Sequence, residues 1–269
     1  MKVILSRKGF DSSYGGSPSA ILPNGELLSF PIPHAVGSTR YGDIRKTTGY
    51  TIKELIVMLG LKVKTEDICH MDPDLVRGSF QRHPDWRPIF GQCGAAAAHL
   101  SGKNVRVGDL FLFFGWFRKT KETPHGLQWD ASDPGRHIIY GYLEIGQIVP
   151  VDMATKVPNW ANYHPHAQRE LRSTPNNVLY IASRFLSGAE SVPGAGVLRF
   201  TEGLALTIEG RNRTEWRLPE FFKSLLITYH SPASWKQDHF RAASRGQEFV
   251  IEESDAVTQW ARSLVTGSL

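Results

Sequence analysis

The sequence has few cysteines and no long hydrophobic run. Among its 269 residues there are only two cysteines, Cys69 and Cys93, too few for a disulfide framework or a four-thiolate zinc site. The most apolar stretch, residues 108–117, is far shorter than the roughly 20 residues that a membrane-spanning helix needs. The N-terminus shows no signal peptide, so we expect a cytoplasmic protein without a membrane partner.

Common nucleotide-binding and metal-binding signatures are missing as well. Neither the P-loop spacing nor the glycine pattern of dinucleotide-binding folds occurs, and no HExxH or Cys/His zinc spacing is present. The chain has no internal repeat, no low-complexity tract and no linker that marks a domain boundary. We therefore expect a single domain over residues 1–269, while the cofactor and the oligomeric state stay open.

What the sequence does contain is a succession of β-branched and aromatic runs. Strands are predicted for residues 2–6, 105–118, 137–151, 177–183, 203–210 and 225–230. Residues 19–33 form a predicted hairpin with an Asn24–Gly25 turn, and the polar residues 119–136 form a predicted long loop. Helices are predicted for residues 51–61, 90–102, 213–223 and 254–265. This order predicts an α+β fold around a curved or barrel-like mixed sheet with flanking helices.

The segment after the first predicted strand is rich in hydrogen-bond donors and small residues. Loops at strand ends often bind ligands, and paired glycines let backbone N–H groups approach an anion. Arginine can hold a phosphate through two hydrogen bonds, and lysine adds a point charge. We predict that Arg7, Lys8, Gly15 and Gly16 bind phosphate here and that Ser6 and Tyr14 also bind the substrate. Asp11 is predicted to act as a base or to bind a ribose, the alternative being a plain polar turn that Asp11 caps.

Several long and unusual motifs carry a family resemblance. They are "SRKGFDSSYGG", "FGQCGAAAAHL", "GDLFLFFGWFR", "HIIYGYLEIG", "HPH", "NNVLYIAS" and "WRLPEFF". With them the chain resembles, from residue 1 to about residue 260, the third family of the nucleotide modification associated domains. The resemblance implies a role in the hypermodification of DNA bases in bacteria and their phages, in modification or defence, and it leaves the reaction open.

A second resemblance lies inside the first. Residues 105–151 are similar to PUA-like barrels of the ASCH type, in which a "GD" turn leads into one barrel strand. The similarity implies a PUA-like core over about residues 100–210 that binds nucleic acid and reads an extruded base. Trp116 and Phe117 would then offer the stacking surface for that base.

Histidines and carboxylates supply the candidate acid–base groups. His164 and His166 flank Pro165, which places both imidazoles on one side of an extended segment, and His137 stands before a predicted strand. We predict that these three histidines act in acid–base catalysis together with Asp11. A metal site formed by His164, His166 and a third ligand such as His137 is an alternative, and the favoured interpretation assigns no metal ligand.

A second set of possible metal ligands lies in "CHMDPD". His70, Asp72 and Asp74 alternate and would share one face of an extended strand, where they suit Mg²⁺ or Mn²⁺. The favoured interpretation is instead that one of the aspartates caps a short helix beginning at Pro73.

Aromatic and amide side chains are the candidates for base recognition. A planar cation beside an aromatic ring can hold a base or a phosphate, and an amide can form two hydrogen bonds with a base edge. The predicted base-binding residues are Trp86, Gln92, Trp116 and Asn177, and Arg118 is predicted to bind the substrate as well. Gln92 and His99 are seven residues apart and would share a face of a helix. Arg211 and Arg213 form either a phosphate-binding patch or a solvated loop.

These features predict a nucleotide- or DNA-binding protein that acts in DNA base modification. The net charge of +5 favours such a polyanionic partner. The favoured interpretation is an enzyme with acid–base side chains next to a phosphate-anchored nucleotide. The alternatives are a non-catalytic PUA-like reader of modified bases and a metal-dependent nuclease or phosphodiesterase.

Overall fold

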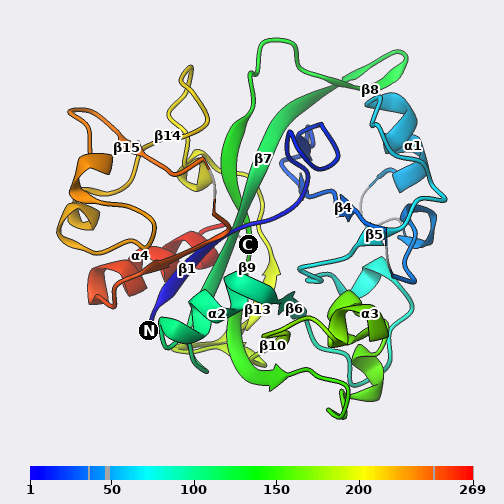
Figure 1. Ribbon diagram of the computed structural model, residues 1–269. Helices are drawn as coiled ribbons and strands as arrows, with labels where there is room; N and C mark the ends of the chain where they lie inside the picture. The colour runs from blue at the N-terminus through cyan, green and yellow to red at the C-terminus, as the bar shows by residue number, and fades with distance from the viewer. Residues whose placement is uncertain (36, 46–48, 245, 269) are drawn as a thin grey trace.

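Two long strands organise the molecule. The computed structural model describes residues 1–35, 37–45, 49–244 and 246–268. Strands β7 (Leu110–Thr123) and β9 (Arg136–Pro150) run antiparallel through the centre and are the longest elements drawn in Figure 1. Residues 110–115 are buried without alternation because both faces of β7 are covered, which accounts for the continuous apolar run in the sequence.

Further strands extend this pair into a curled sheet in the order β16-β1-β7-β9-β10-β6. The added strands are β1 (Val3–Arg7), β16 (Glu248–Ile251), β10 (Val178–Ala182) and β6 (Ile89–Gln92). β1 is parallel to β7 and the other neighbours in this order are antiparallel, so the sheet is mixed. The prediction of an α+β fold around a curved mixed sheet is confirmed.

Shorter elements complete the fold. The remaining strands are β2 (Ser19–Ile21), β3 (Leu27–Leu28), β4 (Ile32–Pro33), β5 (Cys69–His70), β8 (Gly126–Trp129), β11 (Phe185–Leu186), β12 (Ala189–Pro193), β13 (Ala195–Val197), β14 (Glu215–Trp216) and β15 (Phe240–Arg241). The helices are α1 (Ile52–Met58), α2 (Gly94–Gly102), α3 (Arg169–Arg172) and α4 (Asp255–Thr266). No helix in the described part of the chain is long and apolar enough to cross a bilayer.

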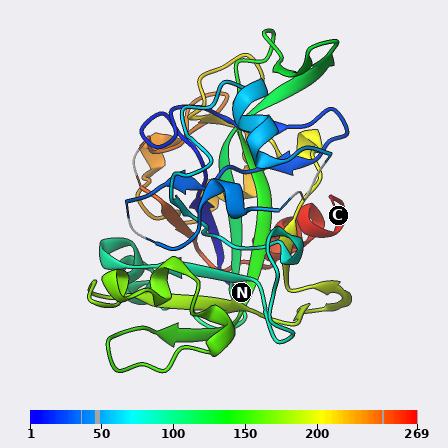
Figure 2. The same ribbon diagram turned by 90° about the vertical axis from the view of Figure 1, so that its right-hand side faces the viewer.

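The long strands separate two halves of the molecule. In Figure 1 the N-terminal segments with α1, β4 and β5 lie to the right of β7, and the C-terminal segments with β14, β15 and α4 lie to the left. Figure 2 shows the N-terminal segments in front of the two long strands. Consecutive side chains of β7 point to opposite sides of the sheet: Phe113 packs against Phe90, whereas Phe114 packs against Trp216.

Local sequence signals account for several elements. The Asn24–Gly25 turn closes the β2/β3 hairpin, with Gly25 at φ +83° and the Asn24 side chain accepting a hydrogen bond from the Glu26 N–H group. Helix α1 begins with a capping box between Thr51 and Glu54 and ends before Gly60 at φ +60°. The predicted strands 2–6, 137–151 and 177–183 and the helix 254–265 are also confirmed.

Other local predictions are wrong. Residues 119–136 are not one long loop, because β7 continues to Thr123 and forms a hairpin with β8. Residues 90–92 belong to β6, which pairs with β10, so the predicted helix 90–102 begins only at Gly94. Residues 203–210 and 225–230 lie outside the named strands, and 213–223 contain β14 and part of a 3₁₀ turn. The errors at β6 and β14 concern pairing partners distant in the sequence, on which strand formation depends, whereas the β7/β8 hairpin is a local pairing that was missed.

The aromatic core on one side of β7 gives a test of the fold. Phe111 is fully buried between Phe90, Phe113 and Tyr180. Replacing it by alanine removes a large ring and leaves a cavity, so we expect Phe111→Ala to lower the free energy of unfolding by about 4 kcal/mol in urea denaturation. Phe185 is 44% exposed, and Phe185→Ala is expected to cost less than about 1 kcal/mol. Equal losses in both variants would contradict this assignment of the core.

Candidate functional site

A buried carboxylate surrounded by three histidines is the most unusual polar feature of the described residues. Asp72 is 4% exposed, and the Nε2 atoms of His70, His164 and His166 each lie 3.5 Å from one of its oxygens. His164 faces Oδ1, whereas His70 and His166 face Oδ2. We call these four residues the His/Asp cluster.

Separate segments build the His/Asp cluster. His70 ends β5, Asp72 follows two residues later, and the other two histidines flank Pro165, the first residue of a 3₁₀ turn. The Gly91 N–H group in β6 donates to Asp72 Oδ1 at 2.9 Å. A Cβ atom on Gly91 would lie 2.3 Å from His166 Cδ2, so only glycine leaves room for the ring here.

Burial and charge set the protonation of the cluster. Burial by itself raises the pKa of Asp72, but the contacts with His164 and His70 outweigh it and hold this pKa well below its usual range. Burial lowers the pKa of His166 to about 4, against the opposing effect of Asp72. At neutral pH an ionised carboxylate therefore faces a neutral His166 imidazole.

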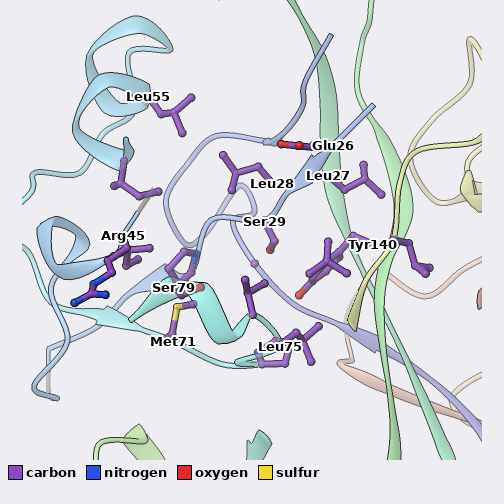
Figure 3. A pocket seen from close by; sticks show the side chains of 18 of the residues that line it. Glu26, Leu27, Leu28, Ser29, Arg45, Leu55, Met71, Leu75, Ser79 and Tyr140 are labelled. Carbon is purple, nitrogen blue, oxygen red and sulfur yellow. The ribbon is translucent and has the colours of Figure 1, made fainter. Parts of the chain in front are cut away.

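A cavity of about 280 Å³ lies beside the cluster, and Asp72 is part of its wall. Figure 3 shows the side chains gathered around it from the N-terminal segments and from Tyr140 on β9. Most of the wall is apolar, with Leu27, Leu28, Leu55, Leu75 and Tyr140 among its residues. Polar groups are supplied by Glu26, Ser29, Arg45, Ser79 and Asp72. The arrangement places a carboxylate with imidazole partners at the edge of an apolar binding space.

Two predicted groups meet in the cluster. His164 and His166 lie together, with ring centroids 5.8 Å apart, although in a 3₁₀ turn and not in an extended segment. Asn177, predicted to bind a base, contacts His166 instead: its Oδ1 lies 2.7 Å from Nδ1. The predicted third partner, His137, is elsewhere, and His70 and Asp72 occupy that place. The two metal sites considered from the sequence, one at His164 and His166 and one at His70 and Asp72, thus lie at the same place in the structure.

Asp74 does not join its neighbours in the cluster. It forms a buried ion pair with Arg82 at 2.7 Å and accepts a hydrogen bond from the Tyr163 hydroxyl. No helix begins at Pro73, so the predicted capping role of the two aspartates is wrong. Trp86 is buried and donates to Tyr163 Oη, which makes it part of this packing.

The opening segment adopts the polar turn that was the alternative to an anion site. Asp11 Oδ1 accepts from the N–H groups of Ser13 and Tyr14, and the Gly16 N–H group donates to the Asp11 carbonyl. Gly15 packs on the Phe10 ring, and Tyr14 is 54% exposed. Gly9, and not the glycine pair, lines the cavity.

The predicted phosphate cradle is not assembled in this structure. Arg7 donates to the carbonyls of Ala243 and Ser244 and lies over the Phe114 ring. Lys8 points to the opposite face of the sheet and forms a buried ion pair of 2.7 Å with Glu248. Gln92 Nε2 donates to the same carboxylate, from β6 and not from a helix shared with His99. Ser6 is buried beside them in β1.

His137 and Trp116 lie on the Arg7 side, whereas Phe117, the other predicted stacking residue, is buried against Tyr140 on the opposite side. His137 Nδ1 accepts a hydrogen bond from Trp216 Nε1. Burial, with the neighbouring charges of Arg7 and Arg213, lowers the pKa of His137 to about 3. Arg213 stacks on the Trp116 ring at 4.0 Å. Two further arginines bind within the protein: Arg118 donates to the Asp130 carbonyl, and Arg211 pairs with Asp238.

Several residues of the site carry no local signal. Gly91, Tyr140 and the leucines of the cavity belong to ordinary apolar segments, and only their packing places them at one point. The spacing of His70 and Asp72 was visible as a ligand pattern, but its partners lie far away along the chain.

The fold and the site define the class as an α+β protein with a buried His/Asp cluster at the edge of an apolar cavity. The chain belongs to the family described as nucleotide modification associated domain 3, whose sequence profile matches residues 2–252. This confirms the first resemblance and relates the protein to nucleotide modification. Searches of curated proteins and of solved structures find no match, so the PUA-like core stays a prediction.

The close approach at Gly91 gives a test of the cluster. In Gly91→Ala the added methyl group would meet both histidine rings, so we expect a loss of about 2 kcal/mol in the free energy of unfolding and displaced histidine resonances in NMR spectra. Gly78 has open space around its Cα, and Gly78→Ala is the matched control. An unchanged histidine spectrum in Gly91→Ala would contradict the described packing.

The buried His137 predicts a loss of stability in acid. The unfolded chain binds a proton at a pKa near 6.5, whereas the folded one does so only near 3. The stabilisation is therefore complete above pH 6.5 and is lost as the pH falls toward 3, by about 4 kcal/mol. His137→Asn keeps an acceptor for Trp216 and does not titrate, so its unfolding free energy should fall less over this interval. Parallel pH profiles for the two proteins would refute the assignment.

Proposed function

We propose that this protein is an enzyme that modifies a base, in a nucleotide or in DNA, at the His/Asp cluster. The base occupies the neighbouring cavity with the reacting edge toward Asp72. One observation carries the proposal: Asp72 belongs both to the wall of the cavity and to the cluster. Membership of a nucleotide modification associated family supports the substrate class.

The cavity suits one base better than a stretch of polymer. Its volume of about 280 Å³ is small, and its wall offers leucine side chains and the Tyr140 ring for contact with a planar, weakly polar group. Ser29 and Ser79 supply hydroxyl groups of the kind that orient a ligand. Arg45, at the edge of the side chains in Figure 3, provides a positive charge suited to a phosphate. A base from DNA would enter after leaving the stack.

The His/Asp cluster supplies proton transfer. Asp72 lines the cavity as an ionised carboxylate, the neutral His166 imidazole lies 3.5 Å from its Oδ2, and both groups can accept a proton. Their role in the proposal is to accept the proton that the base loses when it reacts. His164 and the Gly91 N–H group hold the carboxylate in place. Arg7 and His137 have no part in this step, because they lie on the other side of β7.

The experiment is incubation with DNA and with nucleotides, followed by digestion and mass spectrometry of the bases. A mass shift on one base supports the proposal, provided that it disappears with Asp72→Asn. Shortened strands without a changed base would favour a nuclease. Tight binding to modified DNA without turnover would favour a reader.

Filling the cavity tests whether the base binds there. Leu28 is partly buried in the cavity wall, so we expect Leu28→Trp to lower the modification rate by about tenfold or more while the protein stays folded. Leu226 is 75% exposed, and Leu226→Trp is the matched control with an unchanged rate. Thermal unfolding of both variants verifies the fold. A full rate in folded Leu28→Trp would place the substrate elsewhere.

A further inference from the structure

The protonation of His166 follows from the hydrogen bonds of Asn177. The Asn177 amide nitrogen donates to the carbonyls of His166 at 2.8 Å and Leu171 at 3.0 Å, which fixes the orientation of the amide. Its Oδ1 atom then faces His166 Nδ1 at 2.7 Å, so Nδ1 carries the proton and donates it. The other ring nitrogen, Nε2, therefore presents a lone pair.

That lone pair points at a carboxylate. His166 Nε2 lies 3.5 Å from Asp72 Oδ2, and His70 Nε2 lies at the same distance from this oxygen. An N–H···O hydrogen bond is normally shorter, at about 2.9 Å. Two acceptors that face each other in a buried place repel unless a positive charge stands between them.

The spacing matches the ligand shell of a metal ion. Ligands at about 2.1 Å from one tetrahedral ion are about 3.4 Å apart. The three atoms of His70, Asp72 and His166 all lie within 4.8 Å of one another, which small side-chain adjustments would close around one ion. Two imidazoles and one carboxylate suit divalent first-row transition ions better than Mg²⁺ or Ca²⁺, which prefer oxygen.

The other carboxylate oxygen of Asp72, Oδ1, is contacted by groups that do not reach Oδ2. Asp72 Oδ1 accepts from the Gly91 N–H group at 2.9 Å. His164 Nδ1 accepts a hydrogen bond from the His166 N–H group, which leaves the His164 proton on Nε2, directed toward Oδ1. His164 is thus a positioning residue, and the pattern is that of the outer groups that orient metal ligands.

We propose that His70 Nε2, His166 Nε2 and Asp72 Oδ2 bind one divalent transition-metal ion. With three protein ligands, a further coordination position remains for water or substrate, as in catalytic sites. The cavity wall at Asp72 gives the direction from which a base would approach it. The inference rests on the proposed function and changes one part of it: with Asp72 Oδ2 and His166 Nε2 bound to the ion, a water on the ion would accept the proton from the base. Metal binding itself is measured without any activity.

The test uses the full chain with its purification tag removed, stripped with a chelator and dialysed. It is titrated with Co²⁺, whose visible absorption reports the ligand field, and with Zn²⁺ in a calorimeter. We expect one ion per chain and a higher Tm in the presence of the metal. Absence of binding by the folded chain would overturn the proposal and leave an extra proton as the charge in the cluster.

Variants locate the ion. We expect Asp72→Asn and His166→Gln to weaken Co²⁺ binding at least about 100-fold and His164→Gln to weaken it about tenfold. His99 contacts Thr228 away from the cluster, so His99→Gln is the matched control with unchanged affinity. Circular dichroism confirms folding, and the metal-induced rise in Tm should disappear in Asp72→Asn. Unchanged binding in folded Asp72→Asn and His166→Gln would overturn the assignment.

The two proposals fail in different ways. Metal bound at the cluster of a chain that modifies no base would reject the proposed function and keep the metal site. Base modification that persists in a folded chain shown to bind no metal would reject the metal site and keep the function.

Discussion

The buried charge of Asp72 constrains how the segments on its side of β7 pack together. A carboxylate removed from water is strongly destabilising unless donors or positive charges surround it. The backbone of β6 supplies one donor through Gly91. The turn at Pro165 supplies two imidazoles, of which His164 directs its N–H group at the carboxylate, whereas His166 directs a lone pair at the place of the proposed ion. Strand β10 follows Asn177, which orients one of them. The need to surround the Asp72 carboxylate therefore constrains the relative positions of β5, β6, β10 and the turn at Pro165.

The long strands β7 and β9 separate this polar centre from a second one. Because side chains alternate along a strand, neighbours such as Arg7 and Lys8 serve different sides. On one side the guanidinium of Arg7 lies near the buried His137 and Trp216. On the other side Tyr140 joins the cavity that ends at Asp72. The polar residues of the chain thus belong to two environments, and only one of them adjoins a cavity with a buried carboxylate.

The cavity and the cluster complement each other chemically. An apolar wall with a few hydroxyl groups can hold a planar base, but it offers little reactivity by itself. The His/Asp cluster offers reactivity, but its side chains are almost completely enclosed. Their shared residue, Asp72, connects binding with chemistry. Family membership in nucleotide modification fits this combination and defines the substrate class within which the cluster acts in our proposal.

Several local structures that neighbouring residues decide were predictable, although the β7/β8 hairpin was missed. The turn at Gly25, the capping box of α1 and the amphipathic α4 depend on interactions within a few residues, and the sequence predicted all three. The histidine pair around Pro165 was found as a candidate for the same reason. The helix predicted from residue 90 failed in its first turn, since the strand β6 forms only by pairing with β10.

By itself, the sequence determined the fold class, the family and the inventory of reactive side chains. The tertiary structure decided which of them meet. Arg7, Lys8 and Gly15 are close in sequence but are parted by strand alternation and a tight turn. The segment of His70 and Asp72, Gly91 and His166 lie far apart along the chain and are joined by strand pairing and by the need to surround a buried carboxylate with compensating groups. That need is a property of the folded interior, where water is excluded, and it has no counterpart in the extended chain.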